Sequence, residues 1–314
     1  FPAFPAVLSP PEPVIQKLAK SSGRRTALAK WIGSKDNPIS ARVMVNRIWQ
    51  YHFGRGIVRS SSDFGYQGDK PTHPELLDWL AIRFMDSGWD IKAMHRLIMN
   101  SDAYKRSSKP NDLALEQDPL NHMFWRYDMR RLTSEEVRDS VLNACGTINL
   151  EMGGKSVTPP VPDIVLAGSS VKGKGWGSST PEQANRRSVY VKIMRSMHVP
   201  LLINHDMADT DSTCPVRFTT TVPTQALNML NGQFMNDSAK QFAERLRQEA
   251  GEEVREQIKR ALQIVYSRPL QENEIDQCVA AVNDLMAKHS LNEEEAMDRF
   301  SLLALNLNEF LYLD

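Results

Sequence analysis

The stretch SARVMVNRIWQYHFGRGIV, residues 40–58, limits the choice of fold more than any other part of the chain, because it predicts a helix with apolar side chains on almost every side. At helical spacing, one stripe carries Arg42, Asn46, Trp49 and Phe53, and the neighbouring stripe carries Ala41, Val45, Ile48 and His52. A helix that is apolar on both flanks is buried inside a protein. We therefore expect a helical core around residues 40–58, in which the polar groups need internal partners.

These polar residues predict a structural network rather than a catalytic site, because buried Arg–carboxylate pairs are more often architecture than catalysis. His73 fits the N-cap position of the helix that follows it. The network that we predict contains Arg42, Asn46, Asp63, His73, Asp78, Arg138 and Asp139, with Glu136 as a further acceptor. If Arg42 pairs with a buried carboxylate, Arg42→Ala should cost about 3 kcal/mol of stability.

Helix start and stop signals recur along the chain and predict a mainly α, multi-helical protein. Residues 14–32 are periodic, Asn37-Pro38 begins the helix of residues 40–58, and Gly54 ends it. Pro74 predicts the start of a further helix and Gly88 its end, and Asp90 can cap the next helix. Thr133 with Glu136 and Asn292 with Glu295 predict the starts of two more helices. The segment RSVYVKIM alternates Val189, Val191 and Ile193, which predicts one extended segment and at most a small strand pair.

Composition changes along the chain predict four regions. Residues 1–23 form a Pro-rich arm or linker, and residues 24–145 form an N-terminal helical part. Residues 146–222 are rich in Gly, Pro and Ser and predict a long irregular insertion with a short extended segment. Residues 223–314 return to helical periodicity.

The balance of charge argues against nucleic acid as a partner, because Lys+Arg and Asp+Glu each number 38 and leave no basic excess. Apolar runs are shorter than the roughly 20 residues that a membrane span needs. No charged-then-apolar signal segment opens the chain, and it begins FPAFPAVLSPPEP rather than with Met, so we interpret it as a processed form or a fragment. Cys145, Cys214 and Cys278 are far apart and odd in number, so a disulfide framework is not expected.

The segment HDMADTDSTCPVRF, residues 205–218, is the main candidate for chemistry. His205, Asp206, Asp209 and Asp211 could supply ligands to a divalent cation, and His205, Asp206 and Arg217 are the catalytic candidates, because a His beside a carboxylate can perform acid–base work. The alternative is that Asp206 or Asp209 pairs with Arg217 and pins a loop.

The Gly-rich insertion supplies the candidates for substrate binding, which are Trp176, Arg186 and Arg187. A tryptophan on such a loop could stack on the face of a sugar ring. The chain lacks HExxH, paired CxxC, GxSxG and CxxCH, so the usual signatures of a zincin, a zinc ribbon, an α/β-hydrolase and a covalently held haem are missing. A haem cofactor is therefore not expected in this chain.

Long motifs carry a resemblance to a known family. They are NPISARVMVNRIWQYHFGRGIV, SSDFGYQG, PTHPELLDWLAIRFMDSGWDIKAMHRLIMNSDAY, DPLNHMFWR, RRLTSEEVRDSVL, NRRSVYV, TTTVPTQALNMLN and LNLNEFLYLD. In this order and spacing, over about residues 24–314, the chain resembles the Planctomycete-type PSD1 domain, a domain of unknown function also called DUF1553. His205 and Ala208 depart from the pattern, so a role for His205 would be particular to this chain.

The resemblance implies in which larger proteins such a domain occurs, but it implies no reaction. Such domains form the C-terminal part of large exported bacterial proteins of Planctomycetes and their relatives, behind a DUF1549 domain and often a c-type cytochrome domain. One hypothesis is a helical scaffold or interaction module that docks these neighbouring domains. The other is an enzyme that acts on extracellular polysaccharide or another polymer, metal-dependent or redox-linked, with a site near residues 146–222.

Overall fold

The computed structural model describes residues 3–17, 19–168 and 174–314, and it confirms a mainly α chain. Within these residues it contains fifteen α-helices, two short 3-10 helices and one pair of two-residue strands. None of the described helices is both long and apolar enough to cross a bilayer. The chain divides into two compact parts, called unit 1 (residues up to Met129) and unit 2 (Arg130–Leu313), and each is described by itself.

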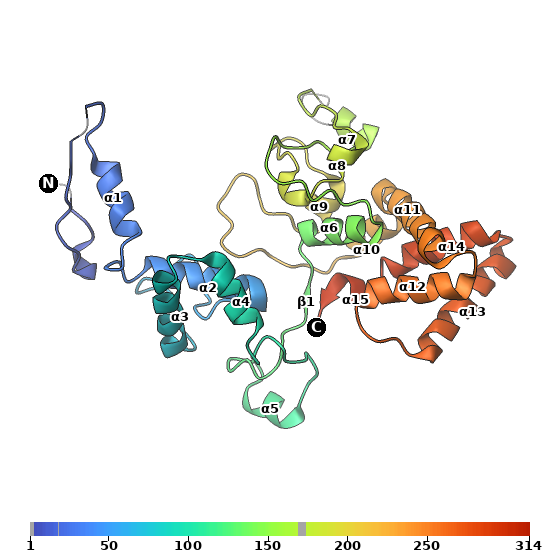
Figure 1. The fold of residues 1–314 in the computed structure, drawn as a ribbon, viewed down its shortest axis with the longest axis horizontal. Coiled ribbons are helices and arrows are strands. Elements are labelled where there is room, and N and C mark those ends of the chain that lie inside the picture. Colours follow the sequence, from blue (N-terminus) through green and yellow to red (C-terminus); the bar gives the residue numbers. More distant parts are fainter. Residues whose placement is uncertain (1–2, 18, 169–173) are drawn as a thin grey trace. The chain divides into compact units, whose positions relative to one another are not determined.

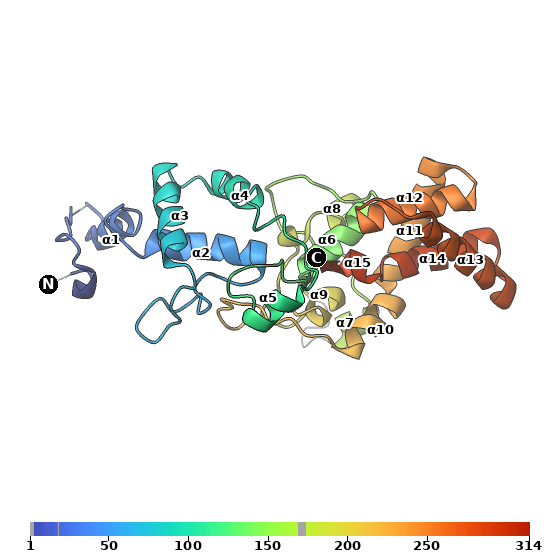
Figure 2. The same ribbon diagram turned by 90° about the horizontal axis from the view of Figure 1, so that it is seen from below.

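Unit 1 is built around the predicted buried helix. Its elements are η1 (Ala6–Leu8), α1 (Arg24–Ile32), α2 (Ser40–Phe53), α3 (Pro74–Asp86), α4 (Ile91–Met99) and α5 (Asp112–Gln117). Helix α2 packs against α3 and α4 (Figures 1 and 2). Val45, Trp49 and Phe53 of α2 are buried in the core of the unit, where Phe53 stacks on Trp49 with 4.3 Å between ring centroids.

Local capping chemistry sets the ends of α2. Asn37 Oδ1 accepts hydrogen bonds from the backbone N–H groups of Ile39 (3.0 Å) and Ser40 (3.1 Å), so the helix starts two residues later than Asn37-Pro38 alone suggests. Gly54 ends it in the left-handed region, with φ 79°. The sequence predicted a helical stretch from residue 14, but the helix begins only at Arg24. Val14 is exposed, so the start of this apolar pattern does not pack against a core.

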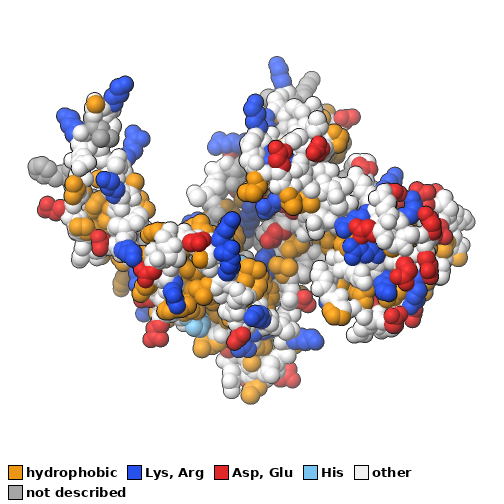
Figure 3. Space-filling view, viewed as in Figure 1, with side chains coloured by type: hydrophobic (Ala, Val, Ile, Leu, Met, Phe, Trp, Pro, Cys, Tyr) orange, Lys and Arg blue, Asp and Glu red, His pale blue; other side chains and the backbone are white. Residues whose placement is uncertain are grey.

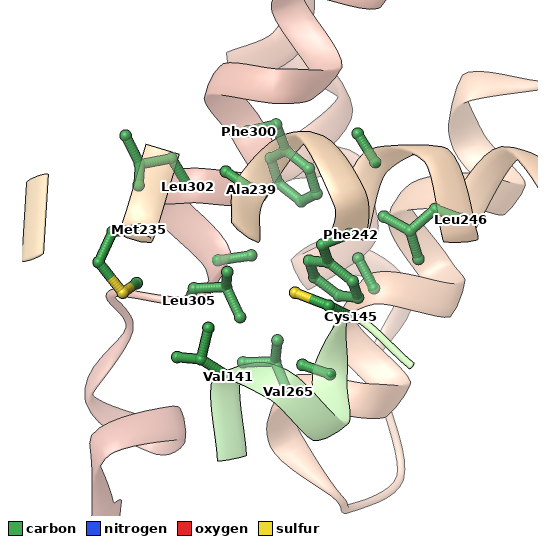
Figure 4. Packing of buried hydrophobic residues seen from close by; sticks show 14 of the residues in the cluster. Val141, Cys145, Met235, Ala239, Phe242, Leu246, Val265, Phe300, Leu302 and Leu305 are labelled. Carbon is green, nitrogen blue, oxygen red and sulfur yellow. The ribbon is translucent and has the colours of Figure 1, made fainter. Parts of the chain in front are cut away.

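Unit 2 holds the larger core. Its elements are β1 (Arg130–Arg131), α6 (Ser134–Ala144), α7 (Asp163–Gly168), α8 (Pro181–Ala184), η2 (Ser188–Tyr190), α9 (Pro200–Asn204), α10 (Pro223–Asn231), α11 (Gln233–Ala250), α12 (Val254–Tyr266), α13 (Glu272–His289), α14 (Glu293–Ala304), α15 (Asn308–Leu311) and β2 (Tyr312–Leu313). Helix α11 packs against α12 and α14, and α6 also contacts it. Figure 4 shows Val141 and Cys145 of the α6 segment directed into the same core as Phe242 of α11 and Leu305.

The strand pair lies elsewhere than the sequence suggested. Strand β1 pairs antiparallel with β2, from the two ends of unit 2. Within the segment RSVYVKIM, only Ser188–Tyr190 form the 3-10 turn η2. The expected alternation of buried and exposed side chains is not present, because Val189 and Ile193 are exposed while Val191 is buried. Val191 forms one isolated bridge, with Val157, so there is no neighbouring strand to extend it within the described residues.

The division between units falls at Met129 and Arg130 rather than at residues 145 and 222. Helix α6 and Leu201 of α9 share one core with the C-terminal helices, which ties three of the regions predicted from composition into one unit. The insertion itself has a small core of its own, which contains Val157, Trp176 and Val191. Residues 169–173 of this insertion lie outside the described residues.

Candidate functional site

A pocket of about 420 Å³ opens in unit 2. Five prolines contribute to its walls: Pro159, Pro160, Pro162, Pro181 and Pro200. Leu142 and Phe234 add apolar surface, and Asn185, Asn228 and Asp237 add polar groups. The combination of apolar walls with a few polar groups is typical of a small-molecule site. Because the starts of α8, α9 and α11 all line this pocket, segments far apart in the sequence build it.

Arg138 is the buried cation of the pocket. It comes from the middle of α6 and exposes only 2% of its surface. Its Nη1 donates to the Arg186 carbonyl (3.0 Å) and to Ser188 Oγ (3.2 Å), and its Nη2 donates to the Ala184 carbonyl (2.6 Å). Among the described residues, Nε–H has no hydrogen-bond partner, so part of the guanidinium is not used by the fold.

The charge of Arg138 is only loosely balanced. Burial lowers its pKa to about 10, partly offset by the nearby Asp139 carboxylate, so the guanidinium stays charged at neutral pH. Asp139 Oδ1 lies 3.9 Å from Arg138 Nη1, and the same oxygen accepts a hydrogen bond of 2.7 Å from the Ser188 backbone N–H. The side chain of Arg138 also lies over the ring of Phe234, 5.8 Å from its centroid.

The first turn of α11 forms another part of the lining. Gly232 is its N-cap residue and supplies no side chain, so the backbone N–H groups of Gln233, Phe234 and Met235 are the unpaired donors of a helix start. The N-terminus of an 18-residue helix also carries a partial positive charge. The Gln233 side chain itself donates to Asp237 at 2.8 and 2.9 Å.

The acidic segment after α9 forms a separate network centred on Asp206. Its carboxylate accepts hydrogen bonds from Arg131 Nη2 (2.6 Å), from Thr220 N and Oγ1 (2.8 Å each) and from Gln225 Nε2 (3.4 Å). Burial acts to raise the pKa of Asp206, but the bonds from Thr220 and Arg131 outweigh it and hold this pKa below its usual range. Asp206 also adopts a left-handed backbone conformation, with φ 62°.

His205 is the residue directly after α9, and its side chain is buried. Its Nδ1 lies 3.0 Å from the Leu201 carbonyl. Burial lowers the pKa of His205, which favours the neutral ring. The side chain is therefore a buried group at the C-terminal end of α9 that contacts a carbonyl of that helix.

Arg217 pairs with Glu135, not with Asp206 or Asp209. Its Nη2 donates to Glu135 Oε1 at 2.9 Å, and Nη1 donates to Oε2. Asp209 closes its own turn by accepting from Asp211 N (2.9 Å) and Ser212 Oγ (2.9 Å). Asp211 is exposed and lies 3.2 Å from Arg195.

The structure thus does not bring the three catalytic candidates, or the four metal-ligand candidates, into one open site. Within the described ranges, no group of three or more His, Cys, Asp or Glu side chains is placed to hold a metal ion.

The predicted substrate-binding residues have structural partners. Trp176 is buried, and its Nε1 donates to the Pro159 carbonyl at 3.1 Å, so its ring is not available for stacking on a sugar in this conformation. Arg186 is buried over the Tyr190 ring and donates to the Glu151 carbonyl at 2.8 Å. Arg187 is half exposed and lies 3.7 Å from Asp139.

The predicted network of unit 1 consists of separate local contacts. Arg42 Nε donates to Asp78 at 2.6 Å, but both side chains are solvent-accessible. Asn46 is fully buried and bonds both backbone groups of Val58. Asp63 accepts from Gly65 N at 2.8 Å. His73 occupies the N-cap position of α3, where its Nδ1 lies 3.0 Å from Thr72 Oγ1.

Sequence reasoning missed most of the pocket. Arg138 was placed in a structural network, and it does hold the chain around Ala184 and Arg186. The segment PPVP at residues 159–162 and the first turn of α11 were not singled out. The available signal was Gly232 directly before an amphipathic helix, which marks a helix start without a side-chain cap.

Residues 24–282 match the family model PSD1, described as a protein of unknown function (DUF1553). No curated protein and no solved structure matches the chain. Because the matched segment covers most of the 314 residues, the chain belongs to the PSD1 (DUF1553) family.

Proposed function

We propose that this chain is a helical scaffold and interaction module of a larger exported bacterial protein, and that its 205–217 segment is architecture rather than an active site. The observation that carries the proposal is the set of bonds around Asp206. One carboxylate joins Arg131 of β1, Thr220 of the following loop and Gln225 of α10. Groups that could have performed acid–base chemistry are engaged in holding segments of unit 2 together.

Unit 1 offers a surface for docking a neighbouring domain. Large apolar side chains of α3 and α4 remain exposed, namely Trp79, Ile82, Ile91, Leu97 and Met99. In Figure 3 hydrophobic side chains gather over the region of α2–α4 on the face in view. Contiguous exposed apolar surface is typical of an interaction site. The partners that the family resemblance suggests are a DUF1549 domain and a c-type cytochrome domain of the same polypeptide.

An enzyme acting on extracellular polysaccharide or another polymer is the alternative, and the pocket of about 420 Å³ is the observation that favours it. Hydrolysis of a glycosidic bond normally uses two carboxylates on either side of the bond. The described residues that line the pocket include one carboxylate, Asp237, which bonds to Gln233. A divalent cation would have to replace the second carboxylate in this reaction. Elemental analysis of the purified protein would show whether a metal is bound.

The docking proposal can be tested in the complete polypeptide. A protease site inserted after the exposed residue Ser9 would separate this chain from the domains before it. We expect the two pieces to stay together on size-exclusion chromatography, and we expect Trp79→Asp combined with Ile82→Asp to release them. Met152→Asp, at an exposed apolar residue of unit 2, is the control and should leave the pieces together. Separation of the unsubstituted pieces would refute docking.

A further inference from the structure

The pocket of unit 2 has rigid apolar walls. Prolines have one backbone torsion fixed and lose little side-chain entropy when a ligand binds. Five of them line the pocket together with Phe234. A largely preformed site costs less free energy to order than one built from long flexible side chains. The walls therefore suit a compact apolar group.

Two independent sources of positive potential meet in the same pocket. The first is the guanidinium of Arg138, which is almost completely buried and whose Nε–H has no partner among the described residues. The second is the start of α11, where the donors of Gln233, Phe234 and Met235 lack a side-chain cap. The two sources have neighbouring side chains, because the Arg138 guanidinium lies over the ring of Phe234, 5.8 Å from its centroid, and both residues line the pocket. Donors of this kind at a helix start bind anions.

The other charges near the pocket limit how much negative charge it can take. Arg138 already faces Asp139 at 3.9 Å, and Asp237 of the lining is itself an anion. A singly charged carboxylate matches what remains of the positive potential better than a phosphate, which carries −1.5 to −2 charges at neutral pH. Asn228, which is half-buried, and the exposed Gln241 also belong to the lining, and their amides can donate hydrogen bonds to a ligand.

We propose that this pocket binds a small amphipathic acid, with the carboxylate at Arg138 and the first turn of α11, and the apolar body between the prolines and Phe234. The site is independent of the docking surface on unit 1, so it adds an activity to the scaffold function. No covalent step is involved.

Isothermal titration of the whole chain with three probes of eight carbon atoms each tests the ligand class. The probes are octanoate, 1-octanol and octyl phosphate. We expect octanoate to bind and 1-octanol to bind at least tenfold more weakly, because a charge-assisted hydrogen bond contributes about 1.5–3 kcal/mol. Equal binding of octanoate and 1-octanol would contradict an anion site. Tighter binding of octyl phosphate than of octanoate would contradict the preference for a carboxylate. If none of the three probes binds, the proposal that this pocket binds an amphipathic ligand is wrong.

Charge variants at Gln233 test the position of the carboxylate without disturbing the buried Arg138. Gln233 is exposed in the first turn of α11. Gln233→Glu should weaken octanoate binding about fivefold, and Gln233→Lys should strengthen it by a similar factor, while 1-octanol binding stays the same for both. The matched control is Gln263→Glu, at an exposed position of α12 outside the pocket lining. Thermal melting of each variant checks that it is folded. If folded Gln233→Glu and Gln263→Glu bind octanoate equally well, the carboxylate does not lie at α11.

Discussion

Both polar atoms of the Asn46 side-chain amide form hydrogen bonds with the backbone of Val58. Asn46 has no exposed surface, its Nδ2 donates to the Val58 carbonyl at 2.9 Å, and its Oδ1 accepts from the Val58 N–H at 2.8 Å. Asn46→Ala would leave two buried backbone groups without partners, so we expect it to lower the free energy of unfolding of unit 1 by about 3 kcal/mol. Urea denaturation followed by tryptophan fluorescence is a suitable measurement, because five of the six tryptophans lie in unit 1.

Arg42→Ala is the control for this prediction, on the same helix. Arg42 and Asp78 form a short ion pair, but both side chains are accessible to water. The loss should therefore be below about 1 kcal/mol rather than the 3 kcal/mol expected for a buried pair. Equal losses for Arg42→Ala and Asn46→Ala would contradict this ranking, because they would show that the accessible ion pair between α2 and α3 contributes as much as the buried amide.

Asp206 should make the stability of unit 2 depend on pH. Its pKa is lowered in the folded chain, so its contribution is complete above the unfolded value of about 3.9 and is lost as the pH falls through the lower folded value. Because Arg131 is buried, we expect Asp206→Asn to cost about 3 kcal/mol at pH 7. The difference from the unsubstituted chain should shrink in denaturation curves as the pH falls below about 4. Asp211→Asn, at an exposed pair, should show neither effect.

At the scale of single elements, the sequence predicts helix ends well, because a cap involves only neighbouring residues. The capping boxes Thr133–Glu136 and Asn292–Glu295 and the N-cap Asp90 are all present. One strand or extended segment was expected around Val191. Val191 is extended and forms one isolated bridge but no strand within the described residues, because alternation makes a strand only where another strand can pair with it.

The site depends on contacts that are distant in the sequence, and these were harder to predict. Arg217 was expected to pair with Asp206 or Asp209 nearby, but its partner is Glu135, 82 residues away. The pocket joins α6, the PPVP segment and the starts of α8, α9 and α11, and no local pattern indicates that these segments meet. Of the residues that line the pocket, the sequence had singled out Arg138, as a member of a structural network.

At the scale of the whole molecule, the core of unit 2 continues across residue 145, where the composition of the chain changes. The change to a Gly- and Pro-rich sequence after Cys145 marks the end of a helix, not the end of a core. Val137 and Val141 of α6 have no exposed surface and belong to the same cluster as Phe242 and Leu262. Removing α6 would expose that cluster and would also remove Arg138 from the pocket.

Two fragments that start at the competing boundaries can decide which one delimits a folding unit. Residues 130–314 contain the whole of unit 2 and all described residues of the pocket lining, so this fragment should unfold in one cooperative transition and bind octanoate as the complete chain does. Residues 146–314 lack β1 and α6, and we expect a broad transition without octanoate binding, because four buried apolar side chains of α6 are missing. Circular dichroism melts and calorimetric titration measure both. Equal stability of the two fragments would place the boundary after Cys145, and it would mean that the burial of α6 contributes little to the core.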